Sequence, residues 1–200
     1  LMTDPNRRGE KLGQLLVGGY APQSTASNAD WVEYYDALSQ AMDHARTGDV
    51  VLIGADCNAS IGRGELDASG WADEHPGAIG PFGCEHINAS GHRLRCFLET
   101  HQLAALTTFF QKRMYGTWMH PRSKRMYQLD HFLTLRCDLK RFSDAGAGAG
   151  RLLHSDHYPL RCKMRVACKL RRKPDGQRTK LSKLDYTPLL DDECGAAFAD

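Results

Sequence analysis

Asp56 and Asn58 directly follow the apolar run at residues 50–53, which is too short for a helix and is predicted to be a buried strand. Two positions apart on an extended segment, their side chains point to the same side. The carboxylate could then act as a base for water while the amide donates to a phosphate oxygen. An Asx turn that closes the strand is the alternative, and it is favoured if this pair is taken alone.

A third candidate, Asp130, lies inside the predicted strand at residues 127–134. Burying a carboxylate in an apolar strand is unfavourable unless it is paired, so we expect a cationic or imidazole partner for it. His157, in Ser155-Asp156-His157, could be that partner and in its charged form would bind a phosphate or stabilise a developing oxyanion. Asp156 would then be free to coordinate a hard divalent cation. The alternative for this tripeptide is an ordinary turn.

Tyr20, in Gly19-Tyr20-Ala21-Pro22, ends another short apolar run. Its phenol could donate to a phosphate or to a leaving oxygen, although an isolated tyrosine is more often a core residue. Polar residues at strand ends can converge on one rim of a sheet, so we expect these four clusters to share a cleft.

The elements that must position these residues are a mixture of strands and helices. Ser27 and Asp30 form a capping-box pattern before an amphipathic helix over residues 28–46, and a second helix is expected over residues 91–103. Short strands are expected at residues 15–17, 50–53, 103–110, 116–119, 127–134 and 160–168, with a long loop at 54–83 and a flexible segment at 145–150. Because the order is not strictly βαβ, we predict an α/β domain with a partly antiparallel sheet. Its expected bounds are residues 14–168, after a loose N-terminus at 1–13 and before a basic linker and tail at 169–200.

The composition excludes several classes of protein. Hydrophobic residues make up 42% and charged residues 25% of the chain, as in soluble globular proteins, and no run approaches the ~18 apolar residues of a membrane span. Seven cysteines without a Cys-x-x-Cys pair argue against a disulfide framework or a structural zinc site, and favour reduced thiols inside the cell. Residues 161–183 carry ten Lys or Arg and one acid, so either a polyanion binds there or the segment is simply solvated.

Taken together, five spaced motifs resemble the endonuclease/exonuclease/phosphatase superfamily, and most closely the apurinic/apyrimidinic-like endonuclease domains of non-LTR (LINE-type) retrotransposons. The resemblance covers about residues 15–168. The motifs are Gly-Tyr20-Ala-Pro, Gly54-x-Asp56-x-Asn58, Thr117-Trp118, Gln128-Leu129-Asp130-His131-Phe132-Leu133 and Ser155-Asp156-His157. The segments Gly80-Pro81-Phe82-Gly83 and Asn88-x-x-Gly91-x-x-Leu94-x-x-Phe97 favour the retrotransposon branch over repair enzymes and lipid phosphatases.

The resemblance implies a four-layer α/β/β/α sandwich that cleaves DNA phosphodiesters with Mg²⁺ or Mn²⁺. It implies that Asp56 activates the attacking water, that Asn58 holds the water and the phosphate, and that Tyr20 lies near the scissile phosphate. Asp130 and His157 would bind that phosphate. The metal ligands would be Asp156, Asp56 and Asn58, and the residues lining the cleft or binding the substrate would be Thr117, Ser155, Arg161 and Lys163.

One departure concerns an Asn and a metal-binding Glu that the family carries on strands before the Gly-Tyr motif. Only Asn6 and Glu10 are candidates here, so we expect a domain that lacks its N-terminal strands. The expected function is nicking of DNA to prime reverse transcription, in the nucleus and with a reverse-transcriptase region in the same polyprotein. The alternatives are a catalytically dead remnant or nucleic-acid-binding module, and another phosphatase or phosphodiesterase reaction of the superfamily. No membrane partner is expected, and the oligomeric state is left open.

Overall fold

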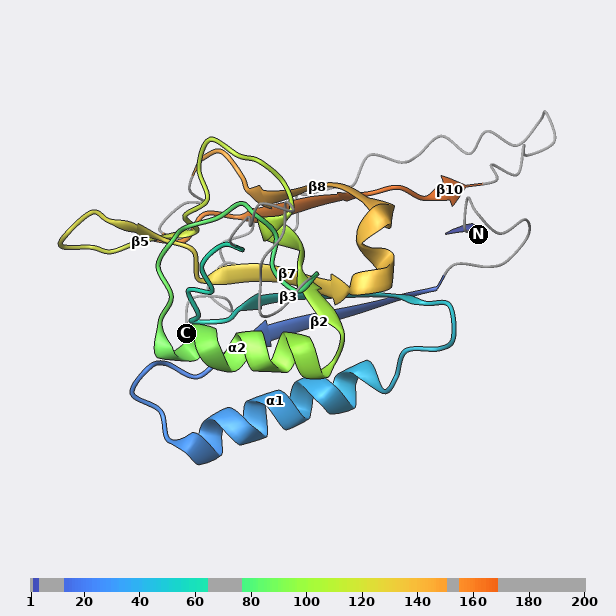
Figure 1. Ribbon diagram of the computed structural model, residues 1–200, viewed down its shortest axis with the longest axis horizontal. Coiled ribbons are helices and arrows are strands. Elements are labelled where there is room, and N and C mark those ends of the chain that lie inside the picture. The colour runs from blue at the N-terminus through green and yellow to red at the C-terminus, as the bar shows by residue number, and fades with distance from the viewer. Residues whose placement is uncertain (1, 4–12, 65–76, 151–154, 169–200) are drawn as a thin grey trace, which may run out of the picture. The chain divides into compact units, whose positions relative to one another are not determined.

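A computed structural model describes residues 2–3, 13–64, 77–150 and 155–168 of the chain (Figure 1). The described residues belong to one compact unit, Leu1–Lys169. Their helices are α1 (Asn28–Met42) and α2 (Ala89–Thr100). Their strands are β1 (Met2–Thr3), β2 (Gln14–Tyr20), β3 (Val50–Asp56), β4 (Leu103–Ala105), β5 (Trp118–Met119), β6 (Met126–Tyr127), β7 (Asp130–Leu135), β8 (Phe142–Ala147), β9 (Leu160–Met164) and β10 (Ala167–Cys168).

The central sheet has the strand order β2-β3-β7-β4. Strands β2 and β3 run parallel, whereas β7 runs antiparallel to both β3 and β4. The mixed α/β class with a partly antiparallel sheet is therefore confirmed. The start of β7 meets the ends of β2 and β3 at one rim of this sheet, because β7 runs the opposite way.

The two faces of β3 pack against different layers. Val51, Ile53 and Ala55 face helices α1 and α2 and form the larger core cluster with Leu94 and Leu98. Val50 and Leu52 lie on the other face, in a cluster with residues of β8 and β9. This alternation, buried on both sides, explains why residues 50–53 read as a continuous apolar run.

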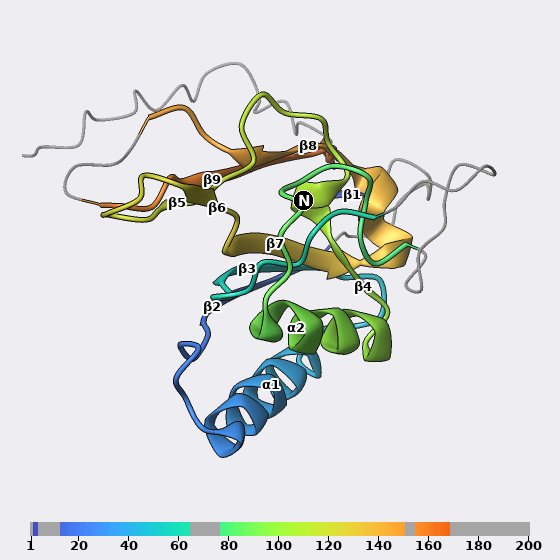
Figure 2. The same ribbon diagram turned by 60° about the vertical axis from the view of Figure 1, so that its left-hand side comes forward.

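Figure 2 shows these layers from the side, with α1 and α2 beneath the central sheet and the two-stranded β8–β9 sheet above it. Both α-helices of the described residues pack on the same face of the central sheet. The described residues thus provide three of the four layers expected of the sandwich: one helical layer and two sheets. No described helix is long and apolar enough to cross a membrane.

Helix α1 begins where the sequence predicted. The Ser27 side chain accepts from the backbone N–H of Asp30, and the Asp30 carboxylate accepts from the backbone N–H of Ser27 at 2.8 Å. The helix ends at Met42 rather than residue 46, before a turn in which the Asp49 carboxylate accepts from the backbone N–H of Arg46.

Several expectations about strands and loops differ from the structure. The strand expected over residues 127–134 is two strands, β6 and β7, and the strand expected over residues 160–168 is β9 and β10. Ala145 and Gly146 are buried within β8, not part of a flexible segment, because Ala145 packs in a core cluster with Phe142 and the Lys112 side chain covers Gly146. The strand expected over residues 103–110 stops at Ala105, where a 3₁₀ turn begins and the Thr108 hydroxyl donates to the Ala105 carbonyl. Met2–Thr3 pairs with β10, although residues 1–13 were expected to be loose; residues 4–12 lie outside the described part.

Candidate functional site

The register of the central sheet places Tyr20, Asp56 and Asp130 in one row across β2, β3 and β7. Tyr20 is the partner of Asp56, and Asp56 is the partner of Asp130. Residues far apart in the sequence therefore meet at the rim predicted for them. Asp56 is an even number of residues from Val50 and Leu52 along β3, so all three side chains point to the same face of the strand. The Asp56 side chain therefore lies on the side of the central sheet that faces β9.

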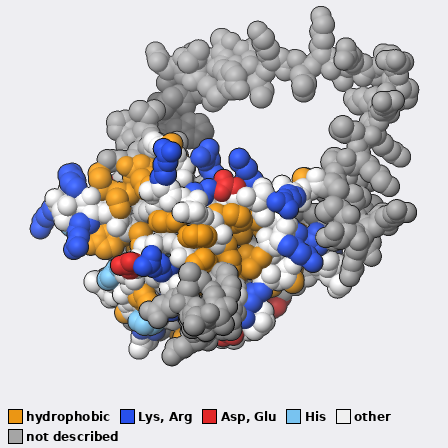
Figure 3. All heavy atoms as spheres, turned by 45° about the horizontal axis from the view of Figure 1, so that its top comes forward, with side chains coloured by type: hydrophobic (Ala, Val, Ile, Leu, Met, Phe, Trp, Pro, Cys, Tyr) orange, Lys and Arg blue, Asp and Glu red, His pale blue; other side chains and the backbone are white. Residues whose placement is uncertain are grey.

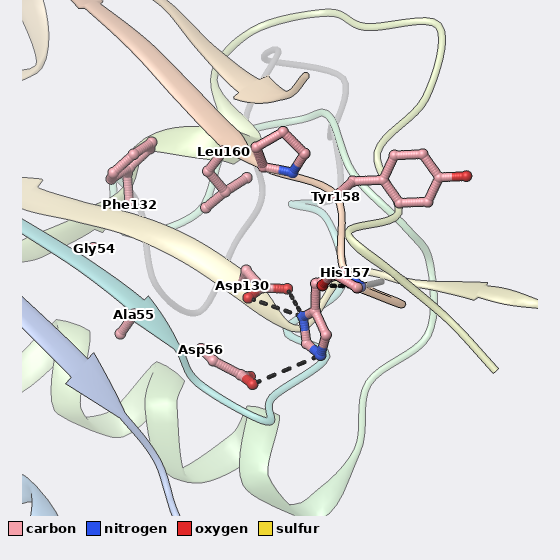
Figure 4. Close-up of a pocket in the computed structure, with 10 residues that line it drawn as sticks. Gly54, Ala55, Asp56, Asp130, Phe132, His157, Tyr158 and Leu160 are labelled. Atoms are coloured by element: carbon pink, nitrogen blue, oxygen red, sulfur yellow. Dashed lines mark hydrogen bonds and ion pairs between the residues drawn. The ribbon is translucent and has the colours of Figure 1, made fainter. Parts of the chain in front are cut away.

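His157 completes this row from outside the central sheet (Figure 4). Its Nδ1 lies 3.0 Å and 3.2 Å from the two carboxylate oxygens of Asp130, and its Nε2 lies 3.9 Å from Oδ2 of Asp56. The expectation that Asp130 would have an imidazole partner is confirmed by this geometry. Since a carboxylate only accepts, Nδ1 carries the proton, and Nε2 is the atom presented to Asp56 and the cleft.

The segment around His157 is held by backbone contacts with the β5 strand. Trp118 forms an isolated antiparallel bridge with His157, and the backbone N–H of Tyr158 donates to the Thr117 carbonyl at 2.7 Å. The Ser155 hydroxyl accepts from the backbone N–H of His157 at 3.1 Å. These contacts fix the imidazole next to Asp130 before any ligand binds.

Burial raises the pKa of the Asp56 carboxyl above its usual range, and the neighbouring Asp130 and Asp156 carboxylates raise it further. The backbone N–H of Asn58 and the His157 imidazole lower this pKa in part. A carboxylate with a raised pKa is a stronger proton acceptor, so Asp56 is suited to take a proton from water.

Asn58 has a left-handed backbone with a φ of 45°. Its backbone N–H donates to the Asp56 carboxylate at 3.0 Å, and its Nδ2 donates to the Ala21 carbonyl at 2.8 Å. The side-chain amide nitrogen thus ties the end of β3 to the end of β2. Asn58 also lines the same cleft as Tyr20 and Asp56, so its amide oxygen is the group with capacity for a ligand.

A cleft of about 590 Å³ lies beside the row of acids. Its lining includes half of the residues predicted for the site: Tyr20, Asp56, Asn58, Asp156 and His157. A smaller adjoining pocket of about 370 Å³ is shown in Figure 4 and includes Asp130 and Ser155. Tyr20 is 66% exposed, so it is not a core tyrosine, and its phenol is accessible to a ligand.

Thr117 occupies a different environment from the cleft lining expected of it, whereas Arg161 and Lys163 lie on the solvent-facing row predicted for the last strand. The Thr117 side chain is fully buried, and its hydroxyl accepts from the backbone N–H groups of Leu129 and Asp130, both at 3.0 Å. Thr117 therefore holds the backbone at Asp130 and does not face the cleft. Arg161 and Lys163 are exposed on β9 and line neither the cleft nor the smaller pocket.

Sequence reasoning missed the aromatic wall of the cleft. Trp118, Tyr127 and His86 line it, with ring centroids 5.8 Å apart for Trp118 and Tyr127 and 5.9 Å for His86 and Tyr127. The indole N–H of Trp118 also donates to the Asp156 carboxylate at 2.7 Å. The β5–β6 pairing of Trp118 with Tyr127, which the short predicted strands did not specify, is what brings these rings together.

Two possible donor sets for a cation share Asp56. Ligand atoms of Asp56, Asp130 and His157 all lie within 4.8 Å of one another. Asp56, Asn58 and Asp156 line the cleft together and offer oxygen only, which is the donor type that Mg²⁺ prefers. The chemistry of both sets fits a divalent cation.

Comparison with curated proteins finds partial relatives. The chain is 27% identical over 166 residues to Craniofacial development protein 2 of Bos taurus, covering 82% of this chain and 26% of that protein. It is 26% identical over 166 residues to the protein of the same name in Tragulus javanicus, covering 82% and 27%. The chain thus spans about a quarter of the length of these relatives. No family model matches it.

Solved structures with partial similarity include the 3'-5' exonuclease NExo of Neisseria meningitidis, at a TM-score of 0.47 and 16% identity over 67% of this chain and 53% of that chain. The catalytic domain of APE2 from Xenopus laevis gives a TM-score of 0.45 and 18% identity over 69% and 44%. A structure described as 3' phosphatase NExo from Neisseria, bound to a product DNA hairpin, gives a TM-score of 0.46 and 15% identity. The match covers 66% of this chain and 52% of that chain.

Proposed function

We propose that this chain is a divalent-cation-dependent phosphodiesterase that cuts one strand of DNA. One observation carries the proposal: the imidazole of His157 is bonded to Asp130 on one side and faces Asp56 at 3.9 Å on the other, beside an open cleft. A proton acceptor beside a group that can donate a proton suits hydrolysis of a phosphate ester.

In the proposed reaction, Asp56 takes a proton from a water molecule whose oxygen then attacks phosphorus. The protonated imidazole of His157, held by Asp130, donates to a non-bridging oxygen as negative charge increases on it. Asn58 positions the phosphate, and the exposed phenol of Tyr20 gives a proton to the leaving oxygen as the phosphorus–oxygen bond breaks. Polar donors in a cleft of this kind contribute to the rate because they are in place before the reaction.

Mg²⁺ or Mn²⁺ would be held by the oxygen set of Asp56, Asn58 and Asp156, and would supply neutralisation of the phosphate charge. We prefer this set because it offers oxygen donors only, and because the Asp130–His157 pair then stays available for the phosphate.

The finer proposal is a retrotransposon-type endonuclease that nicks target DNA for priming, in the nucleus and with reverse transcriptase in the same polyprotein. The order and spacing of the five motifs support this proposal. The second candidate is a remnant without activity, which is favoured by one observation: no glutamate is among the described residues that line the cleft. Asn6 and Glu10, the upstream candidates, lie outside the described residues.

Nicking of supercoiled plasmid DNA with Mg²⁺ tests the proposal. We expect the wild-type chain to convert supercoiled to open-circular DNA, EDTA to stop it, and Asp56→Ala to lower the rate by ~10² or more. Asp36→Ala, which removes an exposed acid on α1, is the matched control and should not change the rate. Equal rates for wild type and Asp56→Ala would refute the proposed mechanism. A folded wild-type chain that never nicks would support the remnant.

A further inference from the structure

The loop that follows β3, residues 57–61, is bonded to two other elements along its backbone. The Ala59 carbonyl accepts from Nε2 of His131 at 2.9 Å, and the Ile61 carbonyl accepts from Nε of Arg95 at 2.8 Å. Ser60 exchanges two bonds with Asn88: its N–H donates to the Asn88 side chain at 3.1 Å, and its carbonyl accepts from the Asn88 N–H at 3.1 Å. A loop bonded in this way has little freedom to move.

Asn88 connects this loop to the start of α2. Its Oδ1 also caps the helix by accepting from the backbone N–H of Gly91 at 2.7 Å. A Cβ on Gly91 would lie 1.9 Å from the Ser60 carbonyl oxygen, so only glycine lets the helix come this close to the loop. The Asn88-x-x-Gly91 pattern thus has a physical meaning, which is to bind the loop to the N-terminus of α2.

His131 connects the same loop to β7. Its side chain is fully buried, with Nε2 on the Ala59 carbonyl and Nδ1 3.2 Å from the Thr107 hydroxyl. A carbonyl only accepts, so Nε2 carries the proton and Nδ1 accepts from Thr107. Burial lowers the pKa of His131, which agrees with a neutral ring. This histidine lies on the opposite face of β7 from its neighbour Asp130, so it does not face the cleft.

The bonded loop contains Asn58, whose positive φ is rare for a residue other than glycine. Such a conformation persists where surrounding contacts determine it. We propose that His131 and Asn88 are positioning residues, which hold residues 58–61 so that the Asn58 side chain stays directed into the cleft beside Asp56. The role of His131 and Asn88 in catalysis rests on the proposed function. Their role in holding residues 58–61 is independent of it.

Two substitutions of His131 test this inference against a merely structural role. His131→Gln places an amide nitrogen near the position of Nε2 and can still donate to Ala59, whereas His131→Asn reaches only about as far as Nδ1. Both put a neutral amide in the same buried space, and His131→Asn should lose more thermal stability because it leaves the Ala59 carbonyl without its donor. Only the difference between them reports on the bond to the loop.

For His131→Gln we expect hydrogen exchange at the amides of Asn58 and Ser60 within about 3-fold of wild type. For His131→Asn we expect exchange at the same amides to be at least ~10-fold faster. If the chain nicks DNA, His131→Asn should lower kcat by ~10²-fold with KM nearly unchanged, as a small misplacement of a reacting group does. His131→Gln should restore most of kcat.

Equal exchange in the two variants would overturn the inference. If neither variant folds, Asn88→Asp and Asn88→Ala make the same comparison from α2, because aspartate keeps the acceptor for Ser60 and Gly91 and alanine does not. Faster exchange in Asn88→Ala alone supports the inference, and no difference overturns it. A wild-type chain that does not nick DNA refutes the proposed function, while the exchange comparison still decides whether the loop is held.

Discussion

Adjacent residues in β3 and β7 perform different tasks because a strand turns successive side chains to opposite faces. Asp56 and Asp130 face the rim, whereas the next residues, Cys57 and His131, are buried. The Cys57 thiol donates to the Ala55 carbonyl within β3, and the His131 imidazole donates to the Ala59 carbonyl in the loop after β3.

Cys57 gives a direct probe of this arrangement. It is 2% exposed, its thiol donates to the Ala55 carbonyl, and burial raises the pKa of the thiol. Because the thiolate is the reactive form, Cys57 should resist iodoacetamide at pH 8 in the folded chain. The exposed Cys96 and Cys137 should react at least ~10²-fold faster, as measured by mass spectrometry of labelled peptides.

Labelling after unfolding in urea is the control, since all the cysteines should then react alike. Rapid modification of Cys57 in the native chain would show that residues 57–61 open readily, contrary to the bonding seen for this loop.

Individual residues differ in how far the sequence could assign them. The partner of Asp130 was predictable because a half-buried carboxylate needs one, and His157 supplies it. The burial of Thr117 was not, because nothing in its neighbours reveals that two backbone N–H groups from residues 129 and 130 converge on its hydroxyl. The local sequence predicts that a buried polar group has a hydrogen-bond or ion-pair partner, whereas only the fold shows which group that partner is.

At the scale of elements, strong local signals were sufficient for α1, α2 and β3. Each of these elements is determined by residues close together in the sequence. The signals are the capping box, the helical spacing of apolar residues and the apolar run before Asp56. The end of β4 and the pairing within β8 depend on distant partners instead. Thr108 accepts from the backbone N–H of Gly80, and Ala145 pairs with Cys162, so neither feature could be predicted from nearby residues.

The approach of α2 to the loop after β3 leads to a prediction about stability. Gly91→Ala should destabilise the chain by about 1–3 kcal/mol, because the added methyl group would collide with the Ser60 carbonyl and one of the two segments must move. Urea unfolding followed by circular dichroism measures this loss of unfolding free energy.

Gly18→Ala is the matched control within the same unit. A Cβ at Gly18 meets nothing within 4 Å, so the free energy of unfolding should stay within about 0.5 kcal/mol of wild type. Similar values for the two variants would mean that α2 and the loop do not approach each other as closely as described.

At the scale of the whole described unit, the sequence predicted that the polar clusters would lie together. It did not predict the strand order and register that bring them together. The row of Tyr20, Asp56 and Asp130 depends on the pairing register of three strands, and a shift by one residue would turn Asp56 to the opposite face. That register is fixed by the two cores on either side of β3, which involve residues from the whole domain. The site is thus specified by packing around it more than by the residues beside it.

The distribution of charge supports a last prediction, about binding of DNA beyond the cleft. Figure 3 views the side that carries the β8–β9 sheet, where Lys and Arg side chains outnumber Asp and Glu. Arg161 and Lys163 are exposed on alternate positions of β9, pointing away from the core. Such a row suits contact with phosphates, which gives affinity without sequence preference.

Replacing both residues, Arg161→Gln and Lys163→Gln, should weaken binding of a DNA duplex equally for different sequences. It should also reduce the slope of log K against log salt by about 2, since each phosphate contact contributes ~0.9. Fluorescence anisotropy over a series of salt concentrations measures both quantities. Arg46→Gln, on the exposed turn after α1, is the control and should leave the slope unchanged. If the double variant keeps the wild-type slope, β9 does not contact the DNA backbone.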